Sequence, residues 1–140
     1  MTHPLDRPVW NALTGRQAHL GIREGDAVRL RPDVGVFVAG KDAASTDDLQ
    51  TICARYPGAG SLEAEGTPLA GWTPRGVTPT INAVLAQMVA TSVTPGPSVD
   101  WTPLGDHDAT DIYDLAMLTN PGPFKPRTFD FGGYIGVRED

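Results

Sequence analysis

The 140-residue sequence has a single cysteine, Cys53, and no apolar run of membrane-spanning length. One cysteine cannot form an internal disulfide, and the first residues, MTHPLDRPVW, lack the basic start and apolar stretch of a signal peptide. The apolar stretch INAVLAQMVA has half of the roughly 20 residues that a membrane-spanning helix requires. We therefore expect a cytoplasmic protein without a membrane anchor.

Basic residues are also scarce. Lys and Arg number 11 against 17 Asp and Glu, which gives a formal net charge of −6 at pH 7. Nucleic acids and anionic lipids bind through clustered Lys and Arg, so we expect neither as a partner. Glycine and proline, in contrast, are abundant at 16 and 13 residues, which predicts many short elements joined by turns.

Hydrophobic spacing divides the chain into short helices and strands. Apolar residues three and four apart predict helices over about 8–20, 45–56 and 105–118. Alternating apolar residues predict strands within 26–40, at 61–65, near 99–103 and at 133–137. The loop over 66–79 is expected to bury Trp72. This order predicts an α/β fold of mixed (α+β) type, a short mixed sheet with flanking helices.

Two features of the middle of the chain bear on domain organisation. INAVLAQMVA, residues 81–90, fits either a helical stripe or a buried strand, and its spacing alone does not decide between them. The stretch TSVTPGPS contains two prolines and a glycine and predicts a boundary near Pro97. We therefore expect an amino-terminal α/β portion over 1–97 and a second portion over 98–140.

Four potential metal ligands, Asp106, His107, Asp108 and Asp111, lie within one short stretch. A divalent ion is one explanation. Helix capping is the stronger one, because Asp at a helix start accepts hydrogen bonds from free backbone N–H groups. Asp108 and Asp111 also have the spacing of a reciprocal cap. We therefore expect no metal site.

Nucleophilic catalysis has little support in the sequence. No serine lies in a G-x-S-x-G motif, and Cys53 falls on the apolar face of a predicted helix, where we expect it in the core. His3 and His19 have no acid or nucleophile near them in sequence, so we interpret them as surface or capping residues. The loop PGPFKP is stiffened by its prolines and is either purely structural or faces a ligand.

Two stretches, HPLDRPVWNALTGRQAHL and PLGDHDATDIYDLAMLTNPGPFKPRTFDFGGYIGVRED, resemble a bacterial subfamily of the GNAT superfamily of N-acetyltransferases. LAQMVA, which lies between them, resembles it too. The resemblance implies that residues from about 99 onward begin a GNAT domain and that 1–97 is an extra amino-terminal portion. It also implies that 81–90 is a strand.

GNAT enzymes transfer an acetyl group from acetyl-CoA to an amine, so the resemblance implies acetyl-CoA as cofactor and an amine as acceptor substrate. Their cofactor turn, Q/R-x-x-G-x-G/A, opens a helix after the fourth strand, beyond residue 140 in a family-length protein. We therefore expect an incomplete GNAT-like fold that is inactive without a carboxy-terminal half. RYPGAG, residues 55–60, matches the turn by letter, but it ends a predicted helix and Pro57 has no N–H to offer phosphate.

The family's loop between its first helices commonly walls the acceptor site. The matching residues, our candidate substrate-binding residues, are Thr119, Pro121, Gly122, Pro123, Phe124, Arg127 and Thr128. No catalytic base can be assigned, because the strands that usually supply it are absent.

The alternative function is a non-catalytic protein-binding module built on a truncated GNAT-like sheet. Its partner would be a complementary chain or a second copy that pairs with the strand at 133–137. We expect Tyr134, Ile135 and Val137 to be incompletely covered within this chain.

Overall fold

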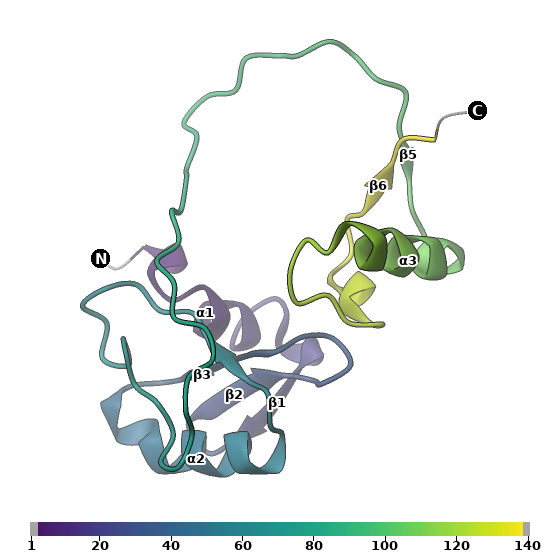
Figure 1. The fold of residues 1–140 in the computed structure, drawn as a ribbon. Coiled ribbons are helices and arrows are strands. Elements are labelled where there is room, and N and C mark those ends of the chain that lie inside the picture. The colour runs from purple at the N-terminus through teal and green to yellow at the C-terminus, as the bar shows by residue number, and fades with distance from the viewer. Residues whose placement is uncertain (1–2, 139–140) are drawn as a thin grey trace.

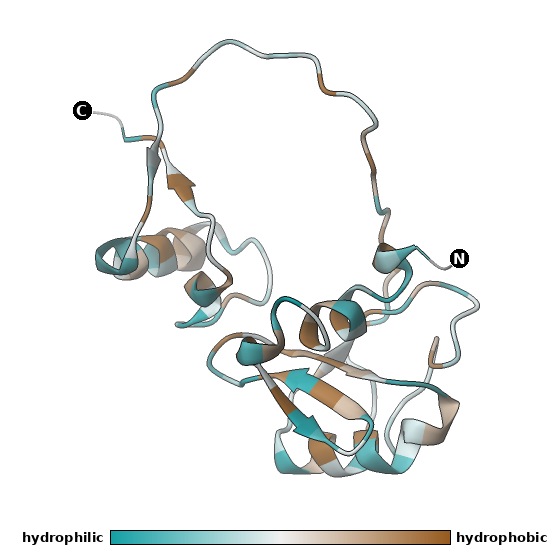
Figure 2. Ribbon diagram, turned by 180° about the vertical axis from the view of Figure 1, so that it is seen from behind, coloured by the Kyte–Doolittle hydropathy of each residue, from teal (hydrophilic) through white to brown (hydrophobic). Residues whose placement is uncertain are grey.

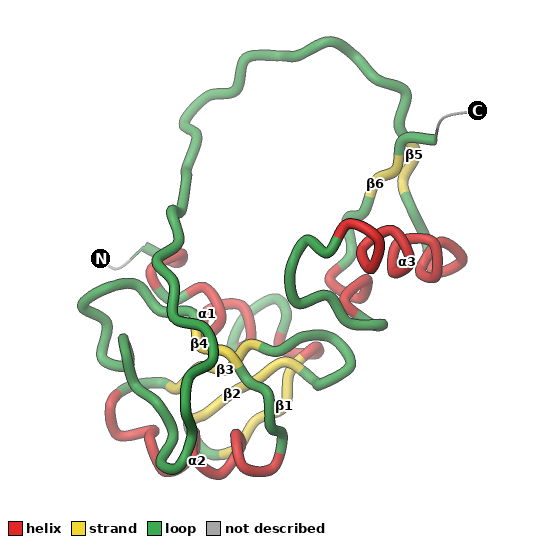
Figure 3. Tube along the Cα trace, viewed as in Figure 1, coloured by secondary structure: helices red, strands yellow, loops and turns green. Residues whose placement is uncertain are grey.

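The computed structural model describes residues 3–138 and consists of two lobes joined by a long extended segment (Figures 1 and 3). We call residues 3–76 the first lobe, 77–101 the linking segment and 102–138 the second lobe. The linking segment runs from one lobe to the other as a wide arc (Figure 1). Among residues 3–138, none of the helices has the length and apolar character that a membrane span requires. The mixture of short helices and strands confirms the predicted α/β fold class.

The first lobe contains a four-stranded sheet and two α-helices. Its elements in chain order are η1 (Pro4–Asp6), α1 (Pro8–Leu13), η2 (Ala18–Leu20), β1 (Gly21–Glu24), β2 (Ala27–Leu30), β3 (Phe37–Gly40), η3 (Ala43–Ser45), α2 (Thr46–Arg55) and β4 (Gly60–Ser61). The strand order is β1-β2-β3-β4, antiparallel except for β3 and β4, which are parallel and connected through α2.

The two faces of this sheet are covered by different helices. Successive side chains of a strand point to opposite faces. Val28 and Ala39 accordingly pack with Val9 and Leu13 of α1, whereas Ala27 and Val38 pack against α2. The second group also contains Leu69. Trp72, which the loop over 66–79 was expected to bury, packs against this group but is only half-buried. Coverage on both faces explains why every residue of β2 is buried.

Two sequence-based boundaries in this lobe need correction. The helix predicted over 8–20 ends at Leu13, and β1 begins at Gly21, which the spacing had placed at the end of a helix. A hairpin explains the difference, because Gly25 adopts φ 54° between β1 and β2 and lets β1 pair with β2. The strand predicted at 61–65 is reduced to β4.

The strand inferred at 81–90 from the family resemblance is wrong for this structure, and so is the helix that its spacing allowed. Residues 77–101 contain neither helix nor strand, and every residue from 75 to 103 is exposed. A strand forms only when its backbone N–H and C=O groups find partners on a neighbouring strand. Within the described residues the arc passes no such neighbour (Figure 3).

The second lobe is a two-stranded sheet with one α-helix, and its elements are β5 (Thr102–Pro103), η4 (Asp106–Asp108), α3 (Ala109–Thr119), η5 (Thr128–Phe131) and β6 (Ile135–Gly136). The predicted apolar face of α3 does not face a core. Leu115 is 60% and Leu118 83% exposed, and the buried residue of the helix is Ala116. This lobe therefore has far less apolar packing than the first.

Incomplete coverage of β6 agrees with the sequence-based expectation. β6 pairs with β5 alone in the described residues, Ile135 is 60% and Val137 57% exposed, and Tyr134 is half-buried. Figure 2 shows apolar residues along the arc and on the second lobe, and most of the large ones are exposed. The boundary predicted near Pro97 falls inside the linking segment.

Candidate functional site

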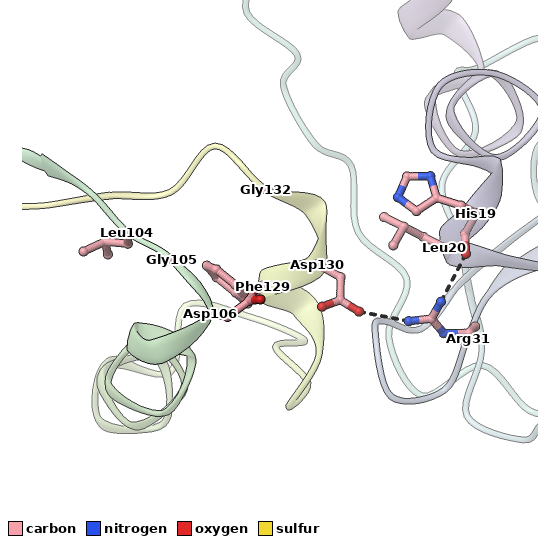
Figure 4. A pocket seen from close by; sticks show the side chains of 9 residues that line it. All are labelled: His19, Leu20, Arg31, Leu104, Gly105, Asp106, Phe129, Asp130 and Gly132. Carbon is pink, nitrogen blue, oxygen red and sulfur yellow. Dashed lines mark hydrogen bonds and ion pairs between the residues drawn. The ribbon is translucent and has the colours of Figure 1, made fainter.

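A cleft of about 430 Å³ lies between the two lobes (Figure 4). The first lobe contributes residues from η2 and from the turn after β2, and the second lobe contributes the turns around η4 and η5. The lining residues are His19, Leu20, Arg31, Leu104, Gly105, Asp106, Phe129, Asp130 and Gly132. The cleft is open, and apolar and charged residues both line it.

An ion pair between Arg31 and Asp130 crosses this cleft from one lobe to the other (Figure 4). Arg31 Nη2 lies 2.9 Å from Asp130 Oδ2, and Arg31 Nη1 donates to the backbone carbonyl of His19 at 3.1 Å. Arg127 Nη2 contacts the other carboxylate oxygen of Asp130 at 2.7 Å. Arg31 and Asp130 therefore pair with groups of the protein itself. The ion pair holds the two lobes together and leaves neither charge free for a ligand.

Two of the predicted substrate-binding residues, Arg127 and Thr128, also hold the two lobes together. The Arg127 backbone N–H donates to Asp33 O at 2.8 Å, and the Thr128 hydroxyl donates to Val34 O at 2.7 Å. Val34 is fully buried in the first lobe, so its carbonyl provides a fixed anchor. These bonds hold η5 against the turn after β2.

The other predicted substrate-binding residues form an exposed loop after α3. Thr119 ends the helix and donates its hydroxyl to Leu115 O at 2.9 Å, and Pro121, Gly122 and Pro123 are exposed. None of the seven predicted residues lines the cleft. The structure thus brings Arg127 and Thr128 to the contact between the lobes and leaves the stretch from Thr119 to Pro123 facing solvent.

Phe124, the remaining predicted residue, anchors the loop to the second lobe. Its ring centroid lies 6.5 Å from that of Tyr113 on α3 and 6.5 Å from that of Tyr134, which it meets edge to face. Tyr134 in turn packs on Phe129 at 5.4 Å. This chain of aromatic contacts, with separations typical of favourable ring pairs, connects the loop to the wall of the cleft.

The acidic cluster at the start of α3 forms caps and ion pairs. Asp108 Oδ2 accepts from the Gly105 N–H at 2.8 Å, and its Oδ1 lies 2.9 Å from Arg138 Nη2. The predicted cap between Asp108 and Asp111 is wrong, because Gly105 takes that place and Asp111 contacts Arg138 instead, at 3.5 Å. In residues 3–138, no three His, Cys, Asp or Glu side chains lie close enough together to hold a metal ion.

The same contacts affect the ionisation of Asp108. The hydrogen bond from the Gly105 N–H, with help from His107 and Arg138, lowers the pKa of Asp108 below its usual value, although burial opposes this effect. The folded state therefore favours the carboxylate. Its stabilising contribution is complete above the unfolded pKa, about 3.9, and is lost as the pH falls through the lower folded pKa.

We expect acid to loosen the start of α3 in the wild type and to have less effect on Asp108→Asn. The asparagine oxygen still accepts from Gly105, but it does not titrate and carries no charge toward Arg138. Amide NMR signals of α3 recorded from pH 7 to pH 2.5 measure the effect. Asp114→Asn, on an exposed part of the same helix, is the matched control and should follow the wild type. The same acid transition in Asp108→Asn and in the wild type would contradict this role for Asp108.

None of the remaining sequence candidates, Cys53, His3 and RYPGAG, forms a catalytic group. Burial raises the pKa of the Cys53 thiol, although Arg29 opposes the effect, so this half-buried cysteine is protonated at neutral pH and packs against the core as expected. His3 caps η1 by accepting from the Leu5 N–H at 3.2 Å, in line with the capping role proposed for it. RYPGAG runs from the end of α2 into β4, so it does not open a helix.

The cleft residues His19, Arg31 and Asp130 were not predicted from the sequence. Arg31 and Asp130 are 99 positions apart, and no local pattern indicates that they meet. The sequence contained one weak indication of this site. Arg127 and Asp130 have the three-residue spacing of an ion pair, and the structure contains that ion pair.

Comparison with solved structures identifies the class of fold. A crystal structure from Novosphingobium aromaticivorans DSM 12444, of a protein assigned to the acetyltransferases of the GNAT family, matches this chain with a TM-score of 0.72 and 28% sequence identity. The match covers 99% of this chain and 60% of that one. This chain thus has a GNAT-like fold and spans about three-fifths of the length of the structure it matches. No family model and no curated protein matches the sequence.

Proposed function

We propose that this chain is the amino-terminal portion of a GNAT-type acetyltransferase, which transfers an acetyl group from acetyl-CoA to an amine when a further polypeptide completes it. The observation that carries the proposal is the match to the Novosphingobium protein over 99% of this chain. In this proposal residues 1–97 are an extra amino-terminal portion, and 98–140 begin the acetyltransferase domain.

The completing polypeptide would supply the cofactor turn. Such a turn binds pyrophosphate through backbone N–H groups at a helix N-terminus that follows a strand. Among residues 3–138, the one sequence match to the turn lies after α2 and leads into β4, so its backbone does not have this arrangement. Acetyl-CoA would therefore bind mainly to the part that this chain does not contain.

The acceptor amine would approach the side of the molecule formed by the loop from Thr119 to Thr128. Two features support this proposal. Phe124 holds the loop in place through ring packing, and Thr128 does so through a hydrogen bond to Val34 O. A loop that forms the wall of a substrate site needs such a fixed conformation. The cleft beside η5 is also lined by the exposed residue Asp106, whose carboxylate attracts a protonated amine.

We expect acetyl-CoA to leave the thermal midpoint of the 140-residue chain unchanged and to raise it once the chain is completed. A ligand stabilises a protein only if it binds the folded state, and the gain grows with the ratio of ligand concentration to Kd. The completed form is a fusion in which the part of the Novosphingobium protein outside the match follows Asp140. Thermal scans of both proteins with and without acetyl-CoA make the comparison, and free CoA at equal concentration is a second ligand for reference.

An equal rise of the thermal midpoint in the 140-residue chain and in the fusion would contradict the proposal that acetyl-CoA binds mainly to the completing part. A shift in neither protein would count against the acetyltransferase proposal itself.

A second candidate function is a non-catalytic protein-binding module, and the exposed apolar residues of the linking segment and second lobe favour it. The partner would be a complementary chain or a second copy paired with β6. Sedimentation at high protein concentration tests this version, which a strictly monomeric chain without a partner would exclude. In either version we place the protein in the bacterial cytoplasm, a location supported by its single, unpaired cysteine.

A further inference from the structure

Apolar side chains from both lobes line the cleft. Leu20 of η2 belongs to the first lobe, and Leu104 and Phe129 belong to the second (Figure 4). Leu20 is 1% and Phe129 9% exposed, so the packing of their own lobes holds both side chains in place. A molecule in the cleft would therefore meet apolar surfaces whose positions are already fixed, which favours an apolar group on the ligand.

The cleft also has free space. Gly105 and Gly132 form part of its lining and add no side chain. Gly132 adopts φ 75°, a conformation that glycine reaches far more easily than other residues, and a Cβ atom there would have no neighbour within 4 Å. The volume of about 430 Å³ lies in the lower part of the range of about 300–1,000 Å³ that is typical of small-molecule sites. The space therefore suits a small molecule.

The charges around the cleft balance, except for one carboxylate. Arg31 pairs with Asp130 at 2.9 Å and with Asp33 at 3.4 Å. Arg127 also pairs with Asp130, at 2.7 Å, so these two cations and two anions neutralise one another. Asp106 is exposed, and its side chain forms no ion pair or hydrogen bond with the rest of residues 3–138. The charge that the cleft offers to a ligand is therefore negative.

We propose that the cleft binds a primary amine carried on an apolar chain or ring, with the ammonium group beside Asp106 and the apolar part against Leu104 and Phe129. This inference rests on the proposed function, and it names the class of acceptor amine. A carboxylate next to the amine would be repelled by Asp106 and would find Arg31 already paired, so the site prefers amines without a carboxylate. The site lies within this chain, and binding does not require the completing polypeptide.

Amide NMR titration of the 140-residue chain with phenethylamine tests the proposal. His19 also lines the cleft, so the titration is run at about pH 8, where histidine is ordinarily neutral and an alkylamine is protonated. We expect saturable shifts at amides of both lobes, around Leu20 in the first and around Gly105 and Gly132 in the second. Shifts that do not saturate, or that are confined to one lobe, would overturn the proposal.

Four further ligands separate the parts of the site. Phenethyl alcohol has the same apolar body without the charge, and phenylalanine adds a carboxylate; each should bind at least about 3-fold more weakly than phenethylamine. Methylamine keeps the charge without the apolar body and should bind at least about 10-fold more weakly. Equal affinities for phenylalanine and phenethylamine would overturn the proposed class. Lysine blocked at its α-amino and carboxyl groups distinguishes two sources of the same chemistry. Tighter binding than phenethylamine assigns the site to a lysine side chain and weaker binding to a free amine, and both results support the proposal.

Substitution of Asp106 tests the position of the ammonium group. Asp106→Asn should weaken phenethylamine about 3- to 5-fold, the strength of an exposed ion pair, and should leave the affinity for phenethyl alcohol unchanged. Asp114→Asn removes the same charge from an exposed position on α3 and should change neither affinity. Amide signals away from the cleft report that both variants are folded. Equal affinities of Asp106→Asn and the wild type for phenethylamine would overturn the proposed role of Asp106.

The remaining outcomes separate this inference from the proposed function. Saturable binding to the 140-residue chain, without CoA release by a folded fusion, would support the inference and count against the acetyltransferase function. CoA release by the fusion with an amino acid as acceptor, without shifts in the cleft, would overturn the inference and leave the function standing. Binding of phenethylamine by the fusion alone would overturn the claim that this chain contains the site.

Discussion

Replacing Phe129 by alanine should unfold the second lobe and leave the first lobe folded. Beyond Leu69, the buried apolar residues of the described chain are Phe129 and Ala116, so the second lobe has little else to hold it together. A buried Phe→Ala substitution costs about 3–5 kcal/mol. That loss exceeds what a lobe with a two-stranded sheet and one helix can tolerate.

Amide NMR spectra report the two lobes separately and make this measurement. In Phe129→Ala, signals of α3 and β6 should move to positions of an unfolded chain, while signals of β2 and β3 stay. Phe131→Ala removes the same side chain from a more exposed position, 36% against 9%, and should cost less than about 1 kcal/mol. An intact second lobe in Phe129→Ala would mean that its polar contacts to the first lobe suffice to hold it.

Replacing Arg29 by alanine should lower the free energy of unfolding of the first lobe by about 3 kcal/mol. The Arg29 side chain is buried next to α2, with 2% exposure, and no carboxylate among the described residues pairs with it. Its Nε donates to Leu30 O at 3.0 Å, Nη1 donates to Tyr56 O, and the guanidinium lies 5.4 Å from the Tyr56 ring centroid. Burial lowers its pKa, and nearby Cys53 and Tyr56 partly oppose that effect.

Alanine at this position would leave the buried carbonyl of Leu30 and the half-buried carbonyl of Tyr56 without this donor, and it would open a cavity beside Tyr56. Urea unfolding followed by circular dichroism gives the free energy. Arg29→Met keeps the apolar stem and should lose about half as much, which separates packing from hydrogen bonding. Arg23→Ala, whose side chain is 59% exposed in a surface ion pair, is the control and should change stability by less than about 0.5 kcal/mol. Equal losses in Arg29→Ala and Arg23→Ala would contradict a structural role for the buried guanidinium.

Local signals were enough to predict most of the first lobe. The helix predicted at 45–56 is α2, and the strands predicted within 26–40 are β2 and β3. These elements have complete apolar faces and turn residues at their ends, so spacing alone identifies them. β1 was missed because its residues are only partly buried and Gly21 also fits a helix end.

In the second half, α3, β5 and β6 overlap the predicted ranges, but the burial of the apolar residues was not predicted correctly. The apolar pattern there matches surfaces that this chain does not cover. The spacing of Leu115 and Leu118 indicates a buried helix face, and that of 81–90 fits either a buried helix or a buried strand, yet both stretches are exposed. Such patterns predict a buried surface but not which polypeptide buries it. The contact between Arg31 and Asp130 could not be predicted from the sequence for another reason, because it depends on how the two lobes dock.

The most direct test of the account is the release of CoA by the completed protein. The fusion described above is incubated with acetyl-CoA and a panel of primary amines, from single amino acids to lysine-containing peptides, and free thiol is measured over time. The proposed function predicts CoA release that depends on one of the amines in the fusion, and none above background in the 140-residue chain. Release by the 140-residue chain alone, or no release and no acetyl-CoA binding by a folded fusion, would contradict it.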